Sequence, residues 1–163
     1  GTQGMAYPTE VVIASTWNTQ LAYDMGVSVG NDAMYANIQG WYAPAMNIHR
    51  TAFSGRNFEY YSEDGFISGQ MGANTVLGAQ SKGLFCYVKH FALNDKEDGR
   101  NGMATFANEQ AIREIYMKPF ELCVKEATAT ISYTGEDGLE LEQGALTTNS
   151  DLPAATPPAT PFR

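Results

Sequence analysis

A lysine and a histidine directly follow a short apolar stretch near the middle of the chain. Leu84 to Val88 is typical of a buried strand, and it ends abruptly at Lys89 and His90. Polar groups at the carboxyl end of a barrel strand face the mouth where active sites form. Lysine supplies a positive charge and donors, and histidine a donor or an acceptor, a pair suited to holding hydroxyls or a carboxylate. The alternative is that both cap the sheet and form ion pairs with Asp95 or Glu97.

A second group of polar and aromatic residues follows the apolar stretch Trp41 to Met46. It runs from Asn47 to Asp64 and is rich in tyrosine, asparagine and charged side chains. Aromatic rings beside planar hydrogen-bonding groups suit a sugar site, because a pyranose has apolar faces and a rim of hydroxyls. A solvated loop with ion pairs between Arg56 and Glu59 or Glu63 explains the same charges. Composition alone leaves both interpretations open.

The composition argues against several classes of protein. The 163 residues include 10 Lys and Arg against 18 Asp and Glu, with no basic stripe, so neither a nucleic-acid partner nor a membrane surface is expected. No run approaches the length of a membrane span. His49 and His90 lack the spacing of metal ligands, so we expect no metal and no cofactor. Cys86 and Cys123 lie in apolar stretches without a CxxC partner, which favours buried thiols and leaves the compartment open.

Apolar runs alternate with amphipathic stretches, which is typical of an α/β fold with a mainly parallel sheet. Strands are predicted at Val11 to Ser15, Trp41 to Met46, Leu84 to Val88 and Thr128 to Tyr133. Helices are predicted at Asn18 to Ile38, Gly65 to Lys82 and Asn108 to Ala127, the last with a kink at Pro119.

The C-terminal part of the chain differs from the rest. We expect a domain at residues 1–133 and a divergent, acidic, proline-rich tail at residues 134–163. Proline cannot continue a helix or donate to a sheet ladder, so this tail is predicted to be disordered or irregular.

Four segments resemble glycoside hydrolase family 3, the β-glucosidase type. They read GWYAPAMNIHRTAFSGRNFEYYSED from Gly40, YVKHFALND from Tyr87, ASTWN from Ala14 and ANEQAIREIYMKPF from Ala107. The resemblance implies a TIM-like (β/α) barrel, of which this chain would form about half, with roughly four parallel strands and three helices. It also implies retaining hydrolysis of terminal β-D-glucosides.

The same resemblance implies roles for particular residues. Arg56, Lys89 and His90 would hydrogen-bond hydroxyls of the sugar in the first subsite, and Asn47 and Asp95 would support them. The expected partner is therefore a small saccharide.

Retaining hydrolysis needs two carboxyl groups about 5 to 5.5 Å apart. The segments that carry the family's nucleophile and acid/base are not found in this sequence, so the catalytic carboxylates stay unassigned. Asp137 and Glu136 are candidates because they directly follow a predicted strand, and Glu63 and Asp95 are further candidates. The alternative is a half-barrel that binds sugar or oligomerises without catalysis.

Half of a closed sheet leaves two edges exposed, and another segment or a partner chain must cover these edges. We therefore expect a homo-oligomer or a domain-swapped dimer.

Overall fold

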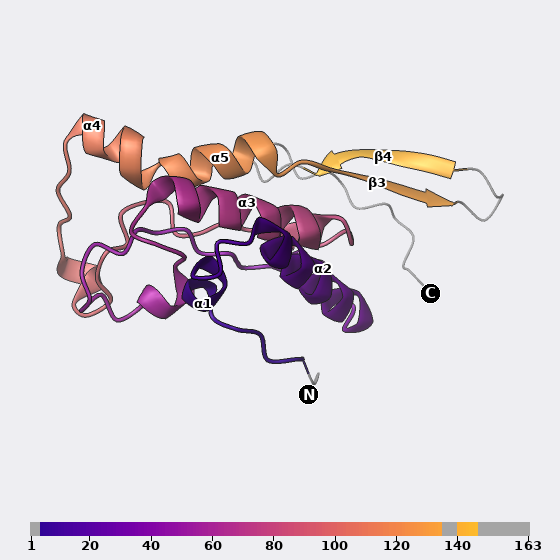
Figure 1. The fold of residues 1–163 in the computed structure, drawn as a ribbon, viewed down its shortest axis with the longest axis horizontal. Coiled ribbons are helices and arrows are strands. Elements are labelled where there is room, and N and C mark those ends of the chain that lie inside the picture. Colours follow the sequence, from indigo (N-terminus) through magenta and orange to yellow (C-terminus); the bar gives the residue numbers. More distant parts are fainter. Residues whose placement is uncertain (1–3, 135–139, 147–163) are drawn as a thin grey trace.

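The computed structural model describes residues 4–134 and 140–146. Three longer helices form most of the fold (Figure 1). Two very short parallel strands lie between them in sequence. In chain order the elements are α1 (Glu10–Ala14), α2 (Thr19–Tyr35), β1 (Gly40–Trp41), the 3-10 turn η1 (Asn57–Glu59), α3 (Gly65–Gln80), β2 (Phe85–Cys86), the 3-10 turn η2 (Arg100–Gly102), α4 (Glu109–Ala111), the π-helical turn η3 (Ile112–Tyr116), α5 (Lys118–Glu126), β3 (Ala129–Thr134) and β4 (Glu140–Leu146).

The helices begin at side chains that cap them. Asn18 Oδ1 accepts the Leu21 N–H at 3.1 Å at the start of α2. Asp64 Oδ1 accepts the Ile67 N–H at 2.7 Å at the start of α3. Each cap satisfies a backbone donor that the helix itself leaves without a partner. The helices predicted at Asn18 to Ile38 and Gly65 to Lys82 are confirmed.

Helix α3 lies between α2 and α5 and forms the centre of the core (Figure 1). Glycines allow α2 and α3 to approach until their backbones touch. A Cβ added at Gly26 would lie 2.1 Å from the Thr75 carbonyl oxygen, and one at Gly78 would lie 2.1 Å from that of Tyr23. No side chain fits in either place, so these two glycines set the distance between the helices.

The parallel pair β1–β2 has one covered face and one open face. Its register joins Gly40 to Phe85 and Trp41 to Cys86. Cys86 belongs to the core, and Trp41 packs against that core. The next residues along each strand, Tyr42 and Tyr87, are 70% and 56% exposed. This alternation follows from the two-residue period of a strand.

The prediction of four parallel strands is wrong for the described residues. The stretch predicted as a strand at Val11 to Ser15 is helix α1, in which the Thr9 carbonyl accepts the N–H groups of Val12 and Ile13. The stretch at Thr128 to Tyr133 does give a strand, β3, but it pairs antiparallel with β4.

The two strands that do pair in parallel are shorter than predicted. Beyond Trp41 and Cys86, only the isolated bridge between Ala45 and Lys89 continues the pairing. Pro44 is fully buried and has no N–H to donate, which limits the ladder at this point.

The helix predicted at Asn108 to Ala127 is divided into three pieces. The π-helical turn η3 ends with the Met117 N–H donating to the Ile112 carbonyl at 2.8 Å, and α5 then begins with Pro119 in its first turn. Proline cannot donate to the preceding turn, so regular α-helical bonding is interrupted there. The predicted interruption at Pro119 is confirmed, because η3 ends at Tyr116 and α5 begins at Lys118.

Part of the predicted tail is ordered as strand β4, so the expectation of an irregular chain is wrong for Glu140–Leu146. Residues 135–139 and 147–163 lie outside the described residues. The domain boundary at residue 133 stays a prediction.

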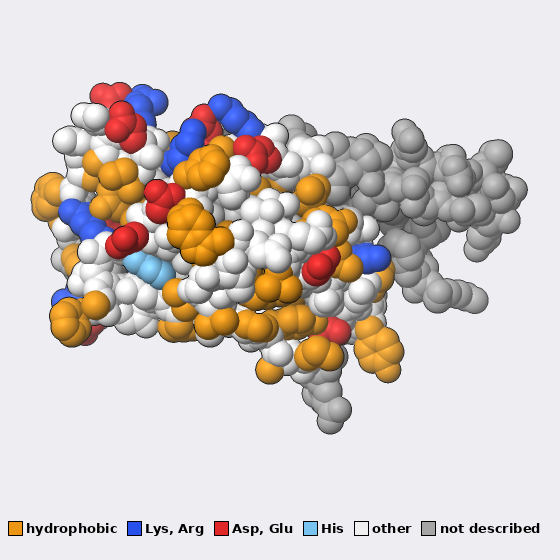
Figure 2. Space-filling model, viewed as in Figure 1, with side chains coloured by type: hydrophobic (Ala, Val, Ile, Leu, Met, Phe, Trp, Pro, Cys, Tyr) orange, Lys and Arg blue, Asp and Glu red, His pale blue; other side chains and the backbone are white. Residues whose placement is uncertain are grey.

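The surface carries both signs of charge. On the described part of the face in Figure 2, acidic and basic side chains are interspersed and hydrophobic side chains gather along one margin. None of the helices within residues 4–134 and 140–146 has the length and apolar character needed to span a bilayer.

The Gly78→Ala variant tests the contact between α2 and α3. We expect it to lower the free energy of unfolding by about 1 to 3 kcal/mol, because the added methyl group meets a backbone oxygen that cannot rotate away. Chemical denaturation measures the change. Gly102→Ala is the control, because nothing lies within 4 Å of a Cβ built there. Equal effects of the two substitutions would contradict the close approach.

Candidate functional site

The candidate site begins where the two parallel strands end. The Met46 N–H donates to the Lys89 carbonyl at 2.7 Å, and the Lys89 N–H donates to the Pro44 carbonyl at 3.1 Å. These bonds align the two segments, so the loops that follow them start side by side. The polar groups singled out in the sequence after Met46 and after Val88 therefore meet in space.

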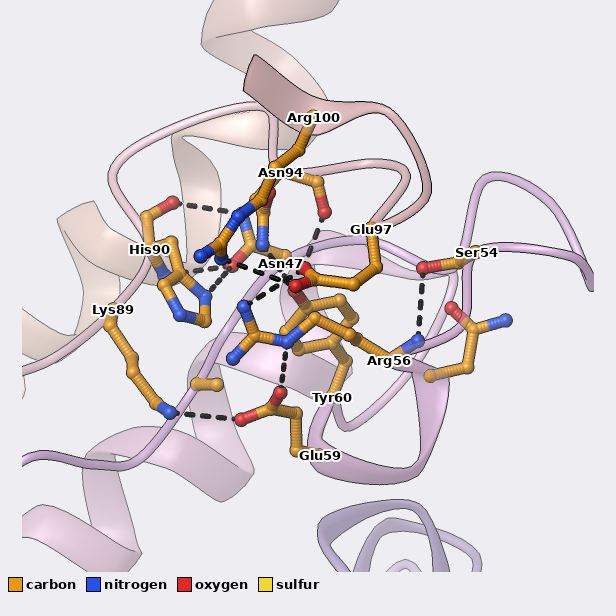
Figure 3. Close-up of polar contacts among 12 residues, drawn as sticks. Asn47, Ser54, Arg56, Glu59, Tyr60, Lys89, His90, Asn94, Glu97 and Arg100 are labelled. Carbon is orange, nitrogen blue, oxygen red and sulfur yellow. Dashed lines mark hydrogen bonds and ion pairs between the residues drawn. The ribbon is translucent and has the colours of Figure 1, made fainter.

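Glu59 joins two of the predicted sugar-binding residues (Figure 3). Its Oε2 atom lies 2.9 Å from Lys89 Nζ, and its Oε1 atom accepts a hydrogen bond from Arg56 Nε. The side chains of all three residues are 15–17% exposed. The network extends from Arg56 to Glu97 at 3.3 Å and from Glu97 to Arg100 at 3.2 Å.

This arrangement keeps the Glu59 carboxylate charged. Burial by itself raises the pKa of Glu59, but the hydrogen bonds from Arg56 and Lys89 outweigh it and leave the pKa below its usual value. The pKa of the Arg56 guanidinium is raised, chiefly by its hydrogen bond to Glu59. Glu59 is therefore an anion fixed between two cations.

Asn47 holds His90 by three contacts. The Asn47 amide donates to the His90 carbonyl at 2.8 Å, and Asn47 Oδ1 accepts the His90 backbone N–H at 2.7 Å. The same oxygen lies 3.2 Å from His90 Nδ1. Because Oδ1 can only accept, Nδ1 carries the proton of a neutral imidazole, and Nε2 is left as an acceptor.

The surroundings of His90 favour that neutral form. Burial lowers the pKa of His90, and the positive charges of Arg56 and Lys89 lower it further. The ring also packs edge-on against Tyr60, with centroids 6.2 Å apart. Lys89 and Arg56 thus offer donors beside an acceptor on His90.

Asp95 occupies a neighbouring position and pairs with a different cation. It is buried, and its Oδ2 atom lies 2.9 Å from Arg50 Nη1. Arg50 in turn lies over the Tyr116 ring, 5.7 Å from its centroid. The alternative in which Lys89 and His90 form ion pairs with Asp95 or Glu97 is wrong, because Lys89 pairs with Glu59 instead.

Sequence reasoning gave Glu59 too small a role and missed Glu10. The Arg56–Glu59 pair was foreseen as a feature of a solvated loop, whereas Glu59 also binds Lys89 from a distant segment. The i,i+3 spacing of Arg56 and Glu59 indicated the ion pair between them, but no pattern indicated the second ion pair with Lys89. Nothing in the sequence pattern indicated that Glu10 reaches Ala45, 35 residues further along the chain.

An open groove of about 830 Å³ lies beside α2. Glu59 is one of its lining residues, whereas Arg56, Lys89 and His90 are not. The walls of the groove are mostly apolar and include Tyr7, Trp41 and Phe58, while Glu10, Asp32 and Glu59 supply carboxyl groups. Within the described part of the chain, no group of three His, Cys, Asp or Glu side chains could hold a metal ion.

The candidate catalytic carboxylates stay predictions. Asp137 and Glu136 lie outside the described residues, and Glu63 is exposed. The carboxylates closest to the predicted sugar-binding residues, Glu59 and Glu97, are each held by two cations. Because the hydrogen bonds from Arg56 and Lys89 hold the pKa of Glu59 below its usual value, its carboxylate is a weak base.

Comparison with known proteins places this chain among the glycoside hydrolases. Residues 1–136 match the model of the glycosyl hydrolase family 3 N terminal domain. The chain is 50% identical over 121 residues to β-glucosidase A of Butyrivibrio fibrisolvens, covering 74% of this chain and 15% of the relative. It is 38% identical over 129 residues to a β-glucosidase of Ruminococcus albus, covering 79% of this chain and 14% of that protein.

Solved structures agree with the sequence comparison. β-Glucosidase 3B from Thermotoga neapolitana, in complex with glucose, superposes with a TM-score of 0.73 at 44% identity, covering 75% of this chain and 17% of that one. DesR, a β-glucosidase from Streptomyces venezuelae in complex with D-glucose, gives a TM-score of 0.76 at 34% identity, covering 77% and 16%. The chain belongs to glycoside hydrolase family 3, and it spans about 15% of the length of the curated relatives that it matches.

The Glu59→Gln variant tests the shared carboxylate. We expect it to lower the free energy of unfolding at pH 7 by about 1 to 3 kcal/mol, because two partly buried cations lose their counter-charge. Urea denaturation measures the change, with the exposed Glu63→Gln as the matched control. Since the fold lowers the pKa of Glu59, its stabilisation is present above the ordinary value of 4.5 and is lost as the pH falls below it. The difference between the two proteins should therefore shrink in acid, and a difference that grows there would contradict this account.

The His90 side chain provides a second pH test. NMR titration of its imidazole should give a pKa below the ordinary value of 6.5 in the folded chain and a normal one in urea. Because the fold disfavours the charged ring, the stability that His90 contributes is present above pH 6.5 and is lost as the pH falls through its folded pKa. A pKa in the folded chain above that in the urea-unfolded chain would contradict this account, because it would show that a neighbouring carboxylate stabilises the protonated ring.

Proposed function

We propose that this chain forms the hydroxyl-binding side of the glucose site of a β-glucosidase within part of a TIM-like barrel. The observation that carries the proposal is the joint placement of Arg56, Lys89 and His90. Glu59 fixes the two cations, and Asn47 fixes the imidazole. Asp95 supports the neighbouring loop through Arg50.

The hydrogen-bonding groups suit a sugar hydroxyl, which both donates and accepts. Lys89 has three N–H donors, and one of them is directed at Glu59. Nε2 of the neutral His90 ring is an acceptor. A hydroxyl between these side chains would have a partner for its oxygen and another for its hydrogen.

The charge balance supports a neutral ligand over an anionic one. The positive charges of Lys89, Arg56 and Arg100 face the carboxylates of Glu59 and Glu97 in one connected network. Because most of the positive charge is already compensated, little remains to attract a carboxylate or a phosphate. Glucose and other neutral pyranoses match this balance.

The proposed reaction is retaining hydrolysis of terminal β-D-glucosidic bonds, as the family resemblance implies, and it is supported by relatives that are named β-glucosidases. It requires a nucleophile and an acid/base carboxyl group facing Lys89 and His90. Asp137 and Glu136 remain the candidates in this sequence. The second candidate function is sugar binding without hydrolysis, which the salt-bridged state of Glu59 and Glu97 favours.

A saccharide is the proposed ligand, and assembly as a homo-oligomer or a domain-swapped dimer is a further part of the proposal. The exposed tyrosines on the open face of the strands, Tyr42 and Tyr87, support such a contact.

Calorimetric titration of the chain with glucose tests the proposed function. The Lys89→Met variant should bind at least about tenfold more weakly, because a charged donor to a hydroxyl is lost. Lys125→Met is the matched control, since Lys125 is exposed on α5 and pairs with Glu121. No heat of binding in the unchanged chain, or equal affinity of Lys89→Met, would overturn the proposal.

An aryl β-glucoside distinguishes the two candidate functions. Turnover that is lost in Asp137→Asn or Glu136→Gln would assign the catalytic pair. Glucose binding without turnover above buffer would leave a sugar-binding chain.

A further inference from the structure

Glu10 makes a contact that the proposed function does not use. It is the first residue of α1, and its Oε1 atom accepts the Ala45 N–H at 3.2 Å. Its Oε2 atom is buried and has no hydrogen-bond partner among the described residues. A carboxyl group in that position needs a reason, because burial of a polar atom without a partner is costly.

The Ala45 N–H lies at an open edge of the sheet. In a parallel pair, the two bonds that surround Ala45 use the Met46 N–H and the Pro44 carbonyl, and both are directed toward Lys89. The N–H of Ala45 itself therefore points to the opposite side. Ala45 is fully buried, so this donor requires a partner, and no described strand supplies one. The Glu10 side chain takes the place of a strand neighbour.

The contact between Glu10 and Ala45 is linked to Lys89 through the backbone hydrogen bonds on either side of Ala45. Lys89 is joined to the segment around Ala45 by both backbone bonds, and its ammonium group continues to Glu59. A shift of the Ala45 backbone would thus move Lys89 as well. We propose, resting on the proposed function, that Glu10 is a positioning residue for Lys89, whose carboxyl group holds the Ala45 N–H and so fixes where the lysine meets Glu59 and the sugar.

The protonation of Glu10 is consistent with this role. Burial raises the pKa of Glu10 well above its usual range, and the nearby Glu59 carboxylate raises it further, while the Ala45 N–H and Lys89 act in the opposite direction. A neutral Glu10 carboxyl group does not compete with Glu59 for the Lys89 ammonium group, whereas a charged Glu10 would. The contact itself needs only an oxygen acceptor for the Ala45 N–H, and a glutamine side chain also offers one.

Two substitutions at this position separate the proposed role from simple burial. Glu10→Gln keeps an oxygen acceptor on a neutral side chain of nearly the same shape, and Glu10→Leu removes the acceptor. Glu109→Leu is the matched control, because Glu109 is 79% exposed on α4 and pairs only with Arg113 among the described residues.

Calorimetric titration with glucose and amide hydrogen exchange at Ala45 are the two measurements. Glu10→Gln should keep the dissociation constant for glucose within about twofold, and Glu10→Leu should raise it about fivefold or more. Exchange at Ala45 should quicken in Glu10→Leu, and the Lys89 side-chain NMR signals should shift there. None of these should change in Glu109→Leu.

Several outcomes would overturn the inference. They are an unchanged dissociation constant with an unchanged Lys89 signal in Glu10→Leu, or a Glu10→Gln variant as weak as Glu10→Leu. If Glu10→Leu fails to fold, Glu10→Asp replaces it, because the shorter side chain withdraws the acceptor and keeps the polarity. If the unchanged chain does not bind glucose, the proposed function fails on its own, and Ala45 exchange and the Lys89 signals still decide whether Glu10 positions the lysine.

Discussion

Two positive side chains from separate segments, Arg56 and Lys89, stay close together because the Glu59 carboxylate lies between them. The three groups are only partly exposed, so they have lost much of the hydration that would otherwise stabilise their charges. Such a network contributes little to net stability, since the desolvation cost offsets much of the attraction. What it does contribute is position, because a carboxylate with two directional partners allows few arrangements of the loop between β1 and α3.

The polar groups divide into those that fix the frame and those that would be left for the proposed sugar. Asn47 satisfies both backbone groups of His90, and Arg50 satisfies one oxygen of Asp95. The Lys89 ammonium group keeps protons beyond the one directed at Glu59, and His90 keeps a ring nitrogen. A rigid frame of this kind lowers the ordering cost when a ligand binds.

The sequence was most informative where local signals act alone. The helix at Thr19–Tyr35 is predictable from its apolar spacing. The glycines of Gly65–Gln80 weaken the same signal, although the Asp64 cap marks where that helix begins. The stretch at Val11 to Ser15 was mistaken for a strand because valine and isoleucine favour strands, whereas backbone bonds to Thr9 fold it into α1. Strand pairing was harder to foresee. The antiparallel partner of β3 and the reach of Glu10 to Ala45 depend on contacts between distant residues, which no local pattern encodes.

The glycines at the contact between α2 and α3 also bear on how cooperatively the chain folds. Most residues of α3 are buried, and several of them are glycines that weaken a helix in isolation. A segment of this composition has little tendency to form its turns before its neighbours are present. Helix α3 therefore depends on docking with α2 and α5, so the three helices should form and melt as one cooperative unit.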